Sequence, residues 1–261
     1  MFDAGLRVEE PARGLVIVTI DRPAARNALT TASGRALVDL YTRLAMRPEM
    51  RALVITGSGD RAFCSGADLK ERATLNAEAA RAQHLTHRLG LTLRGSFEFP
   101  VIAAVNGAAH GGGAELALSS DLVIAATNAR FALPELQRGV MPGMGGTQFL
   151  ARALGGRRAL DLLLSGAELD APRAEELGLV NRVVPPDRLM DEVMRYADRL
   201  MALPPLAVQA AVRSTRGAAD FGGPAGLALE LALHQRLMAS EDRVEGARAF
   251  AEGRPPVWQG R

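Results

Sequence analysis

Residues 106–122 read NGAAHGGGAELALSSDL, in which three consecutive glycines run into a carboxylate and an apolar stretch typical of a helix. Glycine is disfavoured inside strands and helices, so Gly111–Gly113 predict a turn between an apolar strand and the helix that follows. The first N–H groups of a helix lack partners within it, and glycine lets a ligand oxygen approach them closely. Taken alone, the glycines fit close backbone packing as well as they fit a ligand-binding turn.

The first half of the chain alternates short apolar runs with helical patterns. Strands are expected at residues 15–20, 51–57, 101–105 and 122–125, and helices at 33–46 and 77–98. The apolar stripe of the first helix consists of Leu37, Leu40, Tyr41 and Leu44. This order predicts an α/β layered fold with buried parallel strands.

The last part of the chain, from Asp187 onward, has an almost wholly helical pattern. Residues 189–201 carry an apolar stripe wider than burial on one side requires. We therefore expect this region to pack on a core of its own or on another subunit.

The composition is that of an ordinary globular protein of 261 residues, with 48% hydrophobic and 23% charged residues. A net charge of +2 argues against nucleic acid as the main partner. The single cysteine, Cys64, excludes a disulfide framework, is expected to be a small buried hydrophobe and fits a reducing compartment. With no apolar run long enough to span a membrane and no secretory pattern at Met1, a cytoplasmic protein is expected.

A second segment rich in small residues follows the strand at 51–57 and reads CSGADLK over residues 64–70. Backbone N–H groups from this loop and from the glycine segment would together form an oxyanion hole, which stabilises a carbonyl oxygen that gains negative charge. For this loop alone, a plain turn is the simpler interpretation.

Two glutamates could supply acid and base chemistry. Glu115 is predicted in the first turn of the helix after the glycines, and Glu135 lies in the apolar stretch FALPEL. Carboxyl groups among apolar residues have raised pKa values and exchange protons near neutral pH. For either glutamate alone a structural role is the simpler interpretation, in which Glu115 complements the helix dipole and Glu135 caps the next segment. The four histidines lack metal-site spacing, so no metal is expected, and His84 and His87 are expected at the surface or in packing roles.

Several motifs in a fixed order resemble the crotonase, or enoyl-CoA hydratase/isomerase, superfamily. The similarity extends over essentially the whole chain and rests on the motifs DRP and RNAL (21–29), SGADLK (65–70), NG…GGGAEL (106–116), PE (134–135), PGMGGTQ (142–148), DRVEG (242–246) and RPP (254–256). The resemblance implies a spiral of β-β-α repeats over residues 1–200 and a helical oligomerisation region over 201–261. It also implies a homotrimer or a dimer of trimers.

The resemblance also implies roles for individual residues. The oxyanion hole would consist of the N–H groups of Ala67 and Gly112, and the catalytic pair of Glu115 and Glu135. The coenzyme A part of the substrate would contact Arg26, Ala28, Ser65, Asp68, Leu69 and Lys70, the only lysine of the chain. Coenzyme A belongs to the substrate, so no separate cofactor is implied. The segment PGMGGTQ, by its own pattern, is expected to be a structural helix start beside the site.

Because relatives that are hydratases carry both glutamates, the resemblance implies hydration of a trans-2-enoyl-CoA to a 3-hydroxyacyl-CoA. Other members of the superfamily are isomerases or lyases of acyl-CoA, and these remain alternatives. An RNA-binding homologue is less favoured, because the helix at 33–46 is poor in basic residues. A non-catalytic acyl-CoA-binding protein is also less favoured, because both glutamates are present. His110 departs from the pattern, and it either faces the acyl pocket or packs beside the glycines.

Overall fold

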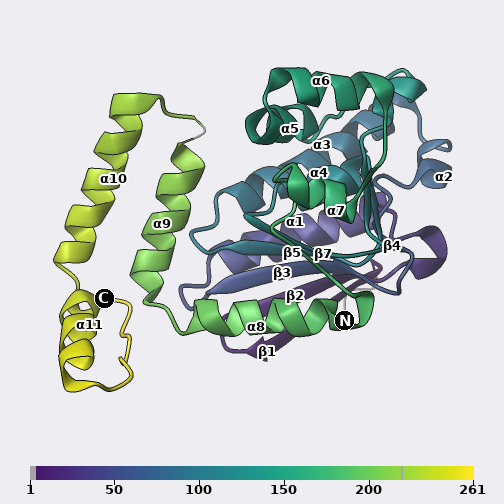
Figure 1. The fold of residues 1–261 in the computed structure, drawn as a ribbon. Helices are drawn as coiled ribbons and strands as arrows, with labels where there is room; N and C mark the ends of the chain where they lie inside the picture. Colours follow the sequence, from purple (N-terminus) through teal and green to yellow (C-terminus); the bar gives the residue numbers. More distant parts are fainter. Residues whose placement is uncertain (1–3, 219) are drawn as a thin grey trace.

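A computed structural model describes residues 4–218 and 220–261, and its first part is built on two sheets (Figure 1). The larger sheet contains, in spatial order, β1 (Leu6–Ala12), β2 (Leu15–Ile20), β3 (Ala52–Gly57), β5 (Val101–Val105), β7 (Leu122–Ala126) and β10 (Arg182–Val184). The smaller sheet contains β4 (Ala62–Cys64), β6 (Ala108–His110), β8 (Arg130–Ala132) and β9 (Leu169–Asp170). Apart from the antiparallel pairs β1–β2 and β8–β9, neighbouring strands are parallel.

The chain passes repeatedly from the large sheet to the small one. β3 leads to β4, β5 to β6 and β7 to β8, and each passage is followed by helical structure before the next turn begins. Repetition of this unit in one direction makes the path a spiral. The α/β architecture and the spiral are therefore confirmed, as are the four expected strands. The three-residue strands of the small sheet were not predicted, because they are too short to display an alternating pattern.

Helices surround the sheets. They are α1 (Thr31–Ala45), α2 (Leu69–Arg72), α3 (Ala77–Gly95), α4 (Gly112–Leu118), α5 (Gly146–Leu154), α6 (Gly156–Ser165) and α7 (Ala171–Glu176), with 3₁₀ turns η1 (Pro23–Ala25), η2 (Glu135–Arg138) and η3 (Pro186–Arg188). The two helices expected from periodicity are confirmed as α1 and α3. The predicted apolar stripe of α1 is buried throughout, with at most 5% of any of its four side chains exposed.

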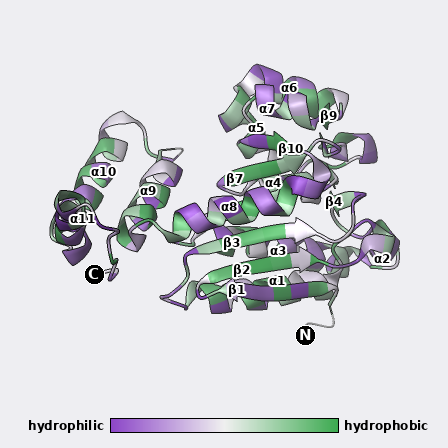
Figure 2. Ribbon diagram, turned by 60° about the horizontal axis from the view of Figure 1, so that its bottom comes forward, coloured by the Kyte–Doolittle hydropathy of each residue, from purple (hydrophilic) through white to green (hydrophobic). Residues whose placement is uncertain are grey.

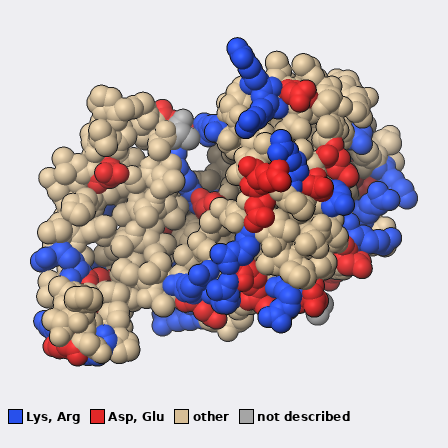
Figure 3. Space-filling model, viewed as in Figure 1, with Lys and Arg blue, Asp and Glu red and all other residues tan. Residues whose placement is uncertain are grey.

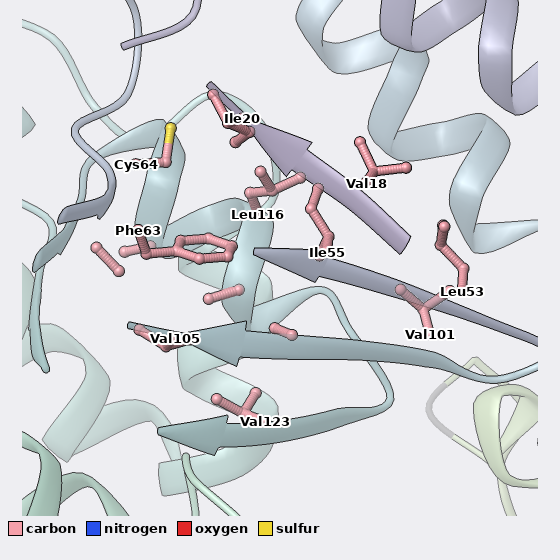
Figure 4. Close-up of a cluster of buried hydrophobic side chains, with 14 of the residues drawn as sticks. Val18, Ile20, Leu53, Ile55, Phe63, Cys64, Val101, Val105, Leu116 and Val123 are labelled. Atoms are coloured by element: carbon pink, nitrogen blue, oxygen red, sulfur yellow. The ribbon is translucent and has the colours of Figure 1, made fainter. Parts of the chain in front are cut away.

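The central strands of the large sheet, β2, β3 and β5, are buried on both faces, which explains their continuous apolar sequences (Figure 2). On one face, side chains such as Val18, Leu53 and Val101 pack in a cluster that also includes Leu116 of α4 and Phe63 of β4 (Figure 4). On the other face, the remaining strand residues pack against α8 (Leu189–Met201). The site loops that follow the strands are therefore anchored on a fully packed sheet.

The C-terminal helices α9 (Pro205–Gly217), α10 (Gly223–Met238) and α11 (Glu241–Glu252) lie to one side of the sheets (Figure 1). The expected helical character from Asp187 onward is confirmed. The expectation that this region packs on a core of its own or on another subunit is wrong for α8, because its wide stripe over 189–201 packs on the large sheet. The predicted division into residues 1–200 and 201–261 falls at the end of α8 and stays a prediction. In the described part of the chain, no helix combines the length and the apolarity needed to cross a membrane.

Candidate active site

The two glycine-containing loops, far apart in sequence, meet at the ends of β4 and β6. A Cβ atom placed on Gly66 would stand 3.0 Å from the Gly112 nitrogen and 3.1 Å from the His110 carbonyl oxygen. A Cβ placed on Gly112 would stand 3.5 Å from the Gly66 Cα and 3.9 Å from the Ala67 nitrogen. The parallel pairing of β4 and β6 brings the loops together, and glycine permits the close approach.

Ala67 forms an isolated parallel bridge with Leu29, and its N–H group points away from Leu29. Leu29 donates to the Gly66 carbonyl (2.8 Å) and accepts from the Asp68 N–H (2.9 Å), so these two bonds flank Ala67 on both sides. In a parallel bridge of this kind, the N–H of the flanked residue points away from the partner strand. In the described chain neither this N–H nor that of Gly112 has a protein acceptor, which leaves both groups available to a ligand.

Gly111 makes the turn that starts helix α4. Its φ of +54° lies in a region that other residues rarely adopt, and its N–H donates to the Ala132 carbonyl of the neighbouring strand (2.9 Å). The Gly111 carbonyl then accepts from the Glu115 N–H (3.0 Å), which begins the helix. Glu115 therefore lies in the first turn of α4, where the sequence placed it.

The Glu115 carboxylate is buried and firmly held, with 2% of the residue exposed. Its Oε1 atom accepts from the N–H groups of Met144 (2.7 Å) and Gly146 (2.8 Å), at the start of α5. Burial raises the pKa of the Glu115 carboxyl, while the two backbone donors and the charge of Arg88 favour its ionised form. The segment PGMGGTQ is a helix start as expected, and its N–H groups fix this carboxylate.

Glu135 opens η2 and lies against the glycine turn. A Cβ on Gly111 would stand 3.1 Å from Glu135 Oε1, so the carboxyl group borders the same loop that carries the Gly112 N–H. Its Oε2 atom is buried and has no hydrogen-bond partner among the described residues. Burial raises the pKa of the Glu135 carboxyl, and the nearby charge of Glu115 adds to this effect. Glu115 thus has two backbone donors on one oxygen, whereas Glu135 has a buried oxygen that accepts no hydrogen bond from the described residues.

The loop after η1 runs beside the 65–70 segment. Arg26 and Asn27 have φ values of 53° and 55°, and the Arg26 carbonyl accepts from the Ser65 N–H (3.1 Å). The fully buried Asn27 side chain donates to the carbonyls of Ser58 (2.9 Å) and Ala62 (2.7 Å), which fixes the turn. The predicted residues therefore belong to two adjacent segments, which are the loop after η1 with Arg26 and Ala28, and the stretch from Ser65 and Asp68 into α2 with Leu69 and Lys70.

Within that group, the Asp68 carboxylate has protein partners. It accepts from the N–H groups of Lys70 (3.1 Å) and Glu71 (3.3 Å) at the start of α2, and it pairs with Arg22 (2.9 Å). Arg22 also donates to the Ala28 carbonyl (2.5 Å), which ties the two loops together. The contacts of Asp68 thus hold the segment in shape.

The outer surface of these loops is positively charged. Arg26, Leu69 and Lys70 are all exposed, and Lys and Arg side chains gather on the side of the molecule where α2 lies (Figure 3). Among the residues that the structure describes, no carboxylate lies within ion-pair distance of Arg26 or Lys70. A flexible ammonium and a guanidinium without acidic partners suit a phosphate-bearing ligand.

The side chain of His110 lies beside Glu168, the residue before β9, and its Nε2 atom is buried. Its Nε2 lies 2.8 Å from an Oε2 of Glu168, whose other oxygen is 3.8 Å from Arg130 Nε. His110 therefore belongs to a partly exposed group of polar side chains with Glu168 and Arg130. No cluster of three or more potential metal ligands occurs among residues 4–218 and 220–261.

Sequence reasoning missed the residues on the far side of Glu115. The loop that binds Glu115 packs on α3: His84 lies against Gly143, where a Cβ would stand 2.3 Å from its ring, and Arg88 donates to the Gly143 carbonyl (3.2 Å). His84 was expected in a surface or packing role, and it does pack. The sequence signal that could have revealed this group is the four-residue spacing of His84 and Arg88, which places both side chains on one face of a helix.

Residues 10–261 match the enoyl-CoA hydratase/isomerase family. The chain belongs to this family. It is 42% identical to the 2,3-dehydroadipyl-CoA hydratase of Escherichia coli over 95% of this chain and 96% of that protein. It is 39% identical to the carnitinyl-CoA dehydratase of Proteus mirabilis over 95% and 97% of the two chains. The resemblance drawn from the motifs is therefore confirmed.

The solved structures of this family agree with the fold. The crystal structure of an enoyl-CoA hydratase from Bacillus anthracis superposes with a TM-score of 0.96 at 35% identity, over 98% of this chain and all of that one. An enoyl-CoA hydratase structure from Geobacillus kaustophilus gives a TM-score of 0.91 at 39% identity over the full length of both. The chain is thus a family member of the hydratase and dehydratase type.

Proposed function

We propose that the protein hydrates trans-2-enoyl-CoA thioesters to 3-hydroxyacyl-CoA. The observation that carries this proposal is a pair of glutamates, Glu115 buried and Glu135 half-buried, with unequal surroundings beside the free N–H groups of Ala67 and Gly112. Glu115 has two backbone donors on one oxygen, whereas Glu135 has a buried oxygen without a partner. Two carboxyl groups held in different protonation states are what an addition of water requires.

The N–H groups of Ala67 and Gly112 are assigned to the thioester oxygen. When water adds to C3 of the C2–C3 double bond, an enolate forms and negative charge develops on this oxygen. Donors fixed by the backbone stabilise that charge without reorganising, and one such donor is typically worth about 3–4 kcal/mol of the barrier. The N-terminal end of α4 adds the favourable end of its helix dipole.

Glu115 is assigned to the water and Glu135 to the proton at C2. The donors from Met144 and Gly146 favour an ionised Glu115, which takes a proton from the water as its oxygen bonds to C3. Burial and the charge of Glu115 favour a protonated Glu135, which delivers its proton to C2. Proton exchange with the next water molecule returns both carboxyl groups to their starting states.

The two adjacent loops around Arg26 and Lys70 are assigned to coenzyme A. Arg26 and Lys70 would attract its phosphates, while Ala28, Ser65 and Leu69 would line its path and Asp68 would hold the loop. These loops continue directly into Ala67, so a thioester bound along them presents its carbonyl to the proposed oxyanion hole.

The test is the hydration of crotonyl-CoA, followed as the loss of its conjugated absorbance. We expect turnover by the wild-type protein and a fall of about 10²–10⁴-fold in kcat for Glu115→Gln and for Glu135→Gln. An isomerase would instead convert a 3-enoyl-CoA to the conjugated isomer and leave crotonyl-CoA unchanged. Turnover unaffected by both substitutions would favour a non-catalytic acyl-CoA-binding role.

We also propose that copies of this chain assemble through the C-terminal helices into a trimer or a dimer of trimers. Exposed large apolar side chains recur there, among them Leu227 and Leu231 of α10 and Phe250 of α11, which is 91% exposed. Sedimentation should give three or six times the chain mass of 27.6 kDa. A monomer at micromolar concentration would contradict the proposed assembly.

A further inference from the structure

The region beyond the two glutamates carries positive charge that the proposed hydration does not use. α3 packs on the loop that binds Glu115, with His84 against Gly143 and the Arg88 Nη1 atom 3.2 Å from the Gly143 carbonyl oxygen. Arg88 is near enough to Glu115 for its charge to favour the ionised carboxylate. Any acyl group that passes Glu115 on this side therefore meets α3.

Arg72 extends the same group of cations. Burial, followed by the neighbouring charges of Arg72 and Arg88, lowers the pKa of His84, so both guanidinium groups lie near its ring. The carboxylate of the adjacent Glu71 is directed toward α1, where its Oε2 accepts from the Thr31 N–H (2.9 Å) and from the Gln83 side chain (2.9 Å). Within residues 4–218 and 220–261, no carboxylate forms an ion pair with Arg72 or Arg88.

The alternative direction for an acyl chain is nearly closed. Behind α4 lies an apolar cavity lined by Ala114, Leu118 and Leu133, and its volume is only about 20 Å³. That space has room for about one water molecule, which needs roughly 10–15 Å³ by the same measure, and it is too small for several methylene groups. With C1 at Gly112 and C2–C3 between the glutamates, a chain of five or six carbons would have to continue toward α3.

We propose that Arg88 and His84, with Arg72 behind them, bind an anionic group at the far end of the acyl chain, so that the preferred substrates are enoyl-CoA thioesters with a terminal carboxylate. The inference rests on the proposed hydration, because it places C1 to C3 of the substrate by that chemistry. Guanidinium groups without acidic partners bind carboxylates through charge-assisted hydrogen bonds. The neutral imidazole of His84 supplies a further donor.

The experiment compares two six-carbon esters that differ only at the far end, trans-2-hexenoyl-CoA and 5-carboxy-2-pentenoyl-CoA. We expect the wild-type kcat/KM to favour the carboxylate ester by about tenfold or more, since a hydrogen bond to a charged group contributes about 1.5–3 kcal/mol. Arg88→Gln should remove most of this preference through KM of the carboxylate ester. Arg88→Lys should retain part of it, because the charge remains without the planar fork.

Arg173→Gln is the matched control, because it removes one positive charge from an exposed arginine on α7 and should leave the preference unchanged. Equal wild-type kcat/KM values for the two esters would overturn the inference, and so would an equal rise in KM for both esters in Arg88→Gln, which would assign Arg88 to the coenzyme A phosphates. Failure to hydrate either ester or crotonyl-CoA would instead overturn the proposed function. Circular dichroism of each variant verifies that the fold is retained.

Discussion

Gly113 lies so close to Cys64 that a Cβ on Gly113 would stand 1.8 Å from the Cys64 carbonyl oxygen. This contact joins α4 to β4, the elements that carry the two halves of the proposed oxyanion hole. Each of the three glycines has a different reason to be there. Gly111 needs a positive φ, Gly112 lies beside the Met144 methyl group and the Gly66 Cα, and Gly113 admits the Cys64 backbone.

Gly113→Ala should therefore disrupt the site more than a single methyl group usually does. The methyl group would overlap backbone rather than a flexible side chain, so α4 must move away from β4, at a cost of about 1–3 kcal/mol or more in the free energy of unfolding. Urea unfolding and crotonyl-CoA turnover measure the two effects. Gly95→Ala, at the end of α3 with no atom within 4 Å, is the matched control and should be neutral or slightly stabilising. Equal stability of the two variants would contradict the close contact.

Much of the fold could be predicted because it depends on local pattern. The apolar stripe of α1 and the continuous apolar runs of β2, β3 and β5 follow directly from burial on one or two faces. The first-turn position of Glu115 followed from the glycine turn in the same way. The short strands of the small sheet carry too few residues to produce a pattern, and tertiary pairing alone creates them.

The partners of the site residues could not be predicted, because they are distant in sequence. The donors to Glu115 come from residues 144 and 146, and the partner of His110 is Glu168. Neither pairing has a periodic or compositional signal. The clustering of His84 and Arg88 at Gly143 likewise arises only when α3 packs on the loop before α5.

Arg94 is the clearest example of a position that the sequence pattern does not predict. A charged residue in a polar helix is expected to be exposed, but only 1% of the surface of Arg94 is exposed. Its guanidinium donates to the Leu116 carbonyl (2.7 Å) and to Ser119, at the C-terminal end of α4. Arg94→Ala should lower the free energy of unfolding by about 3 kcal/mol, because it leaves a cavity beneath α4.

Arg94→Met should change stability by only about 1 kcal/mol, since it fills the same space without a buried charge. Urea unfolding of both variants separates the two contributions. Equal losses for methionine and alanine would mean that the charge, rather than the volume, stabilises this region.

Lys70→Ala should raise KM for the CoA thioester more than it lowers kcat. The side chain is exposed on α2 and has no acidic partner in the described chain, so its proposed role is attraction of phosphate, away from the reacting carbons. Steady-state kinetics with crotonyl-CoA at low and high salt measure this, because screening should reduce the difference from wild type. An unchanged KM would assign Lys70 to ordinary surface charge.

Glu135→Gln should stabilise the protein at pH 8 while it abolishes most turnover. In the folded state, burial and the charge of Glu115 raise the pKa of Glu135 above its ordinary value of 4.5. The folded protein therefore binds this proton more tightly than the unfolded chain does. The resulting stability is fully present below pH 4.5 and is lost as the pH rises through the raised pKa, by about 1.4 kcal/mol per unit of difference.

Glutamine is uncharged at every pH, so the variant does not lose stability as the pH rises. Its Tm should therefore exceed that of wild type at pH 8, and this difference in Tm, the gap, should be smaller at pH 5. Thermal unfolding at the two pH values measures the gap, with the exposed Glu176→Gln on α7 as a control that should show no such change. The same titration should produce the alkaline limb of the wild-type kcat profile, because the ionised Glu135 has no proton to deliver. A gap of the same size at both pH values would mean that Glu135 is not held protonated by its surroundings.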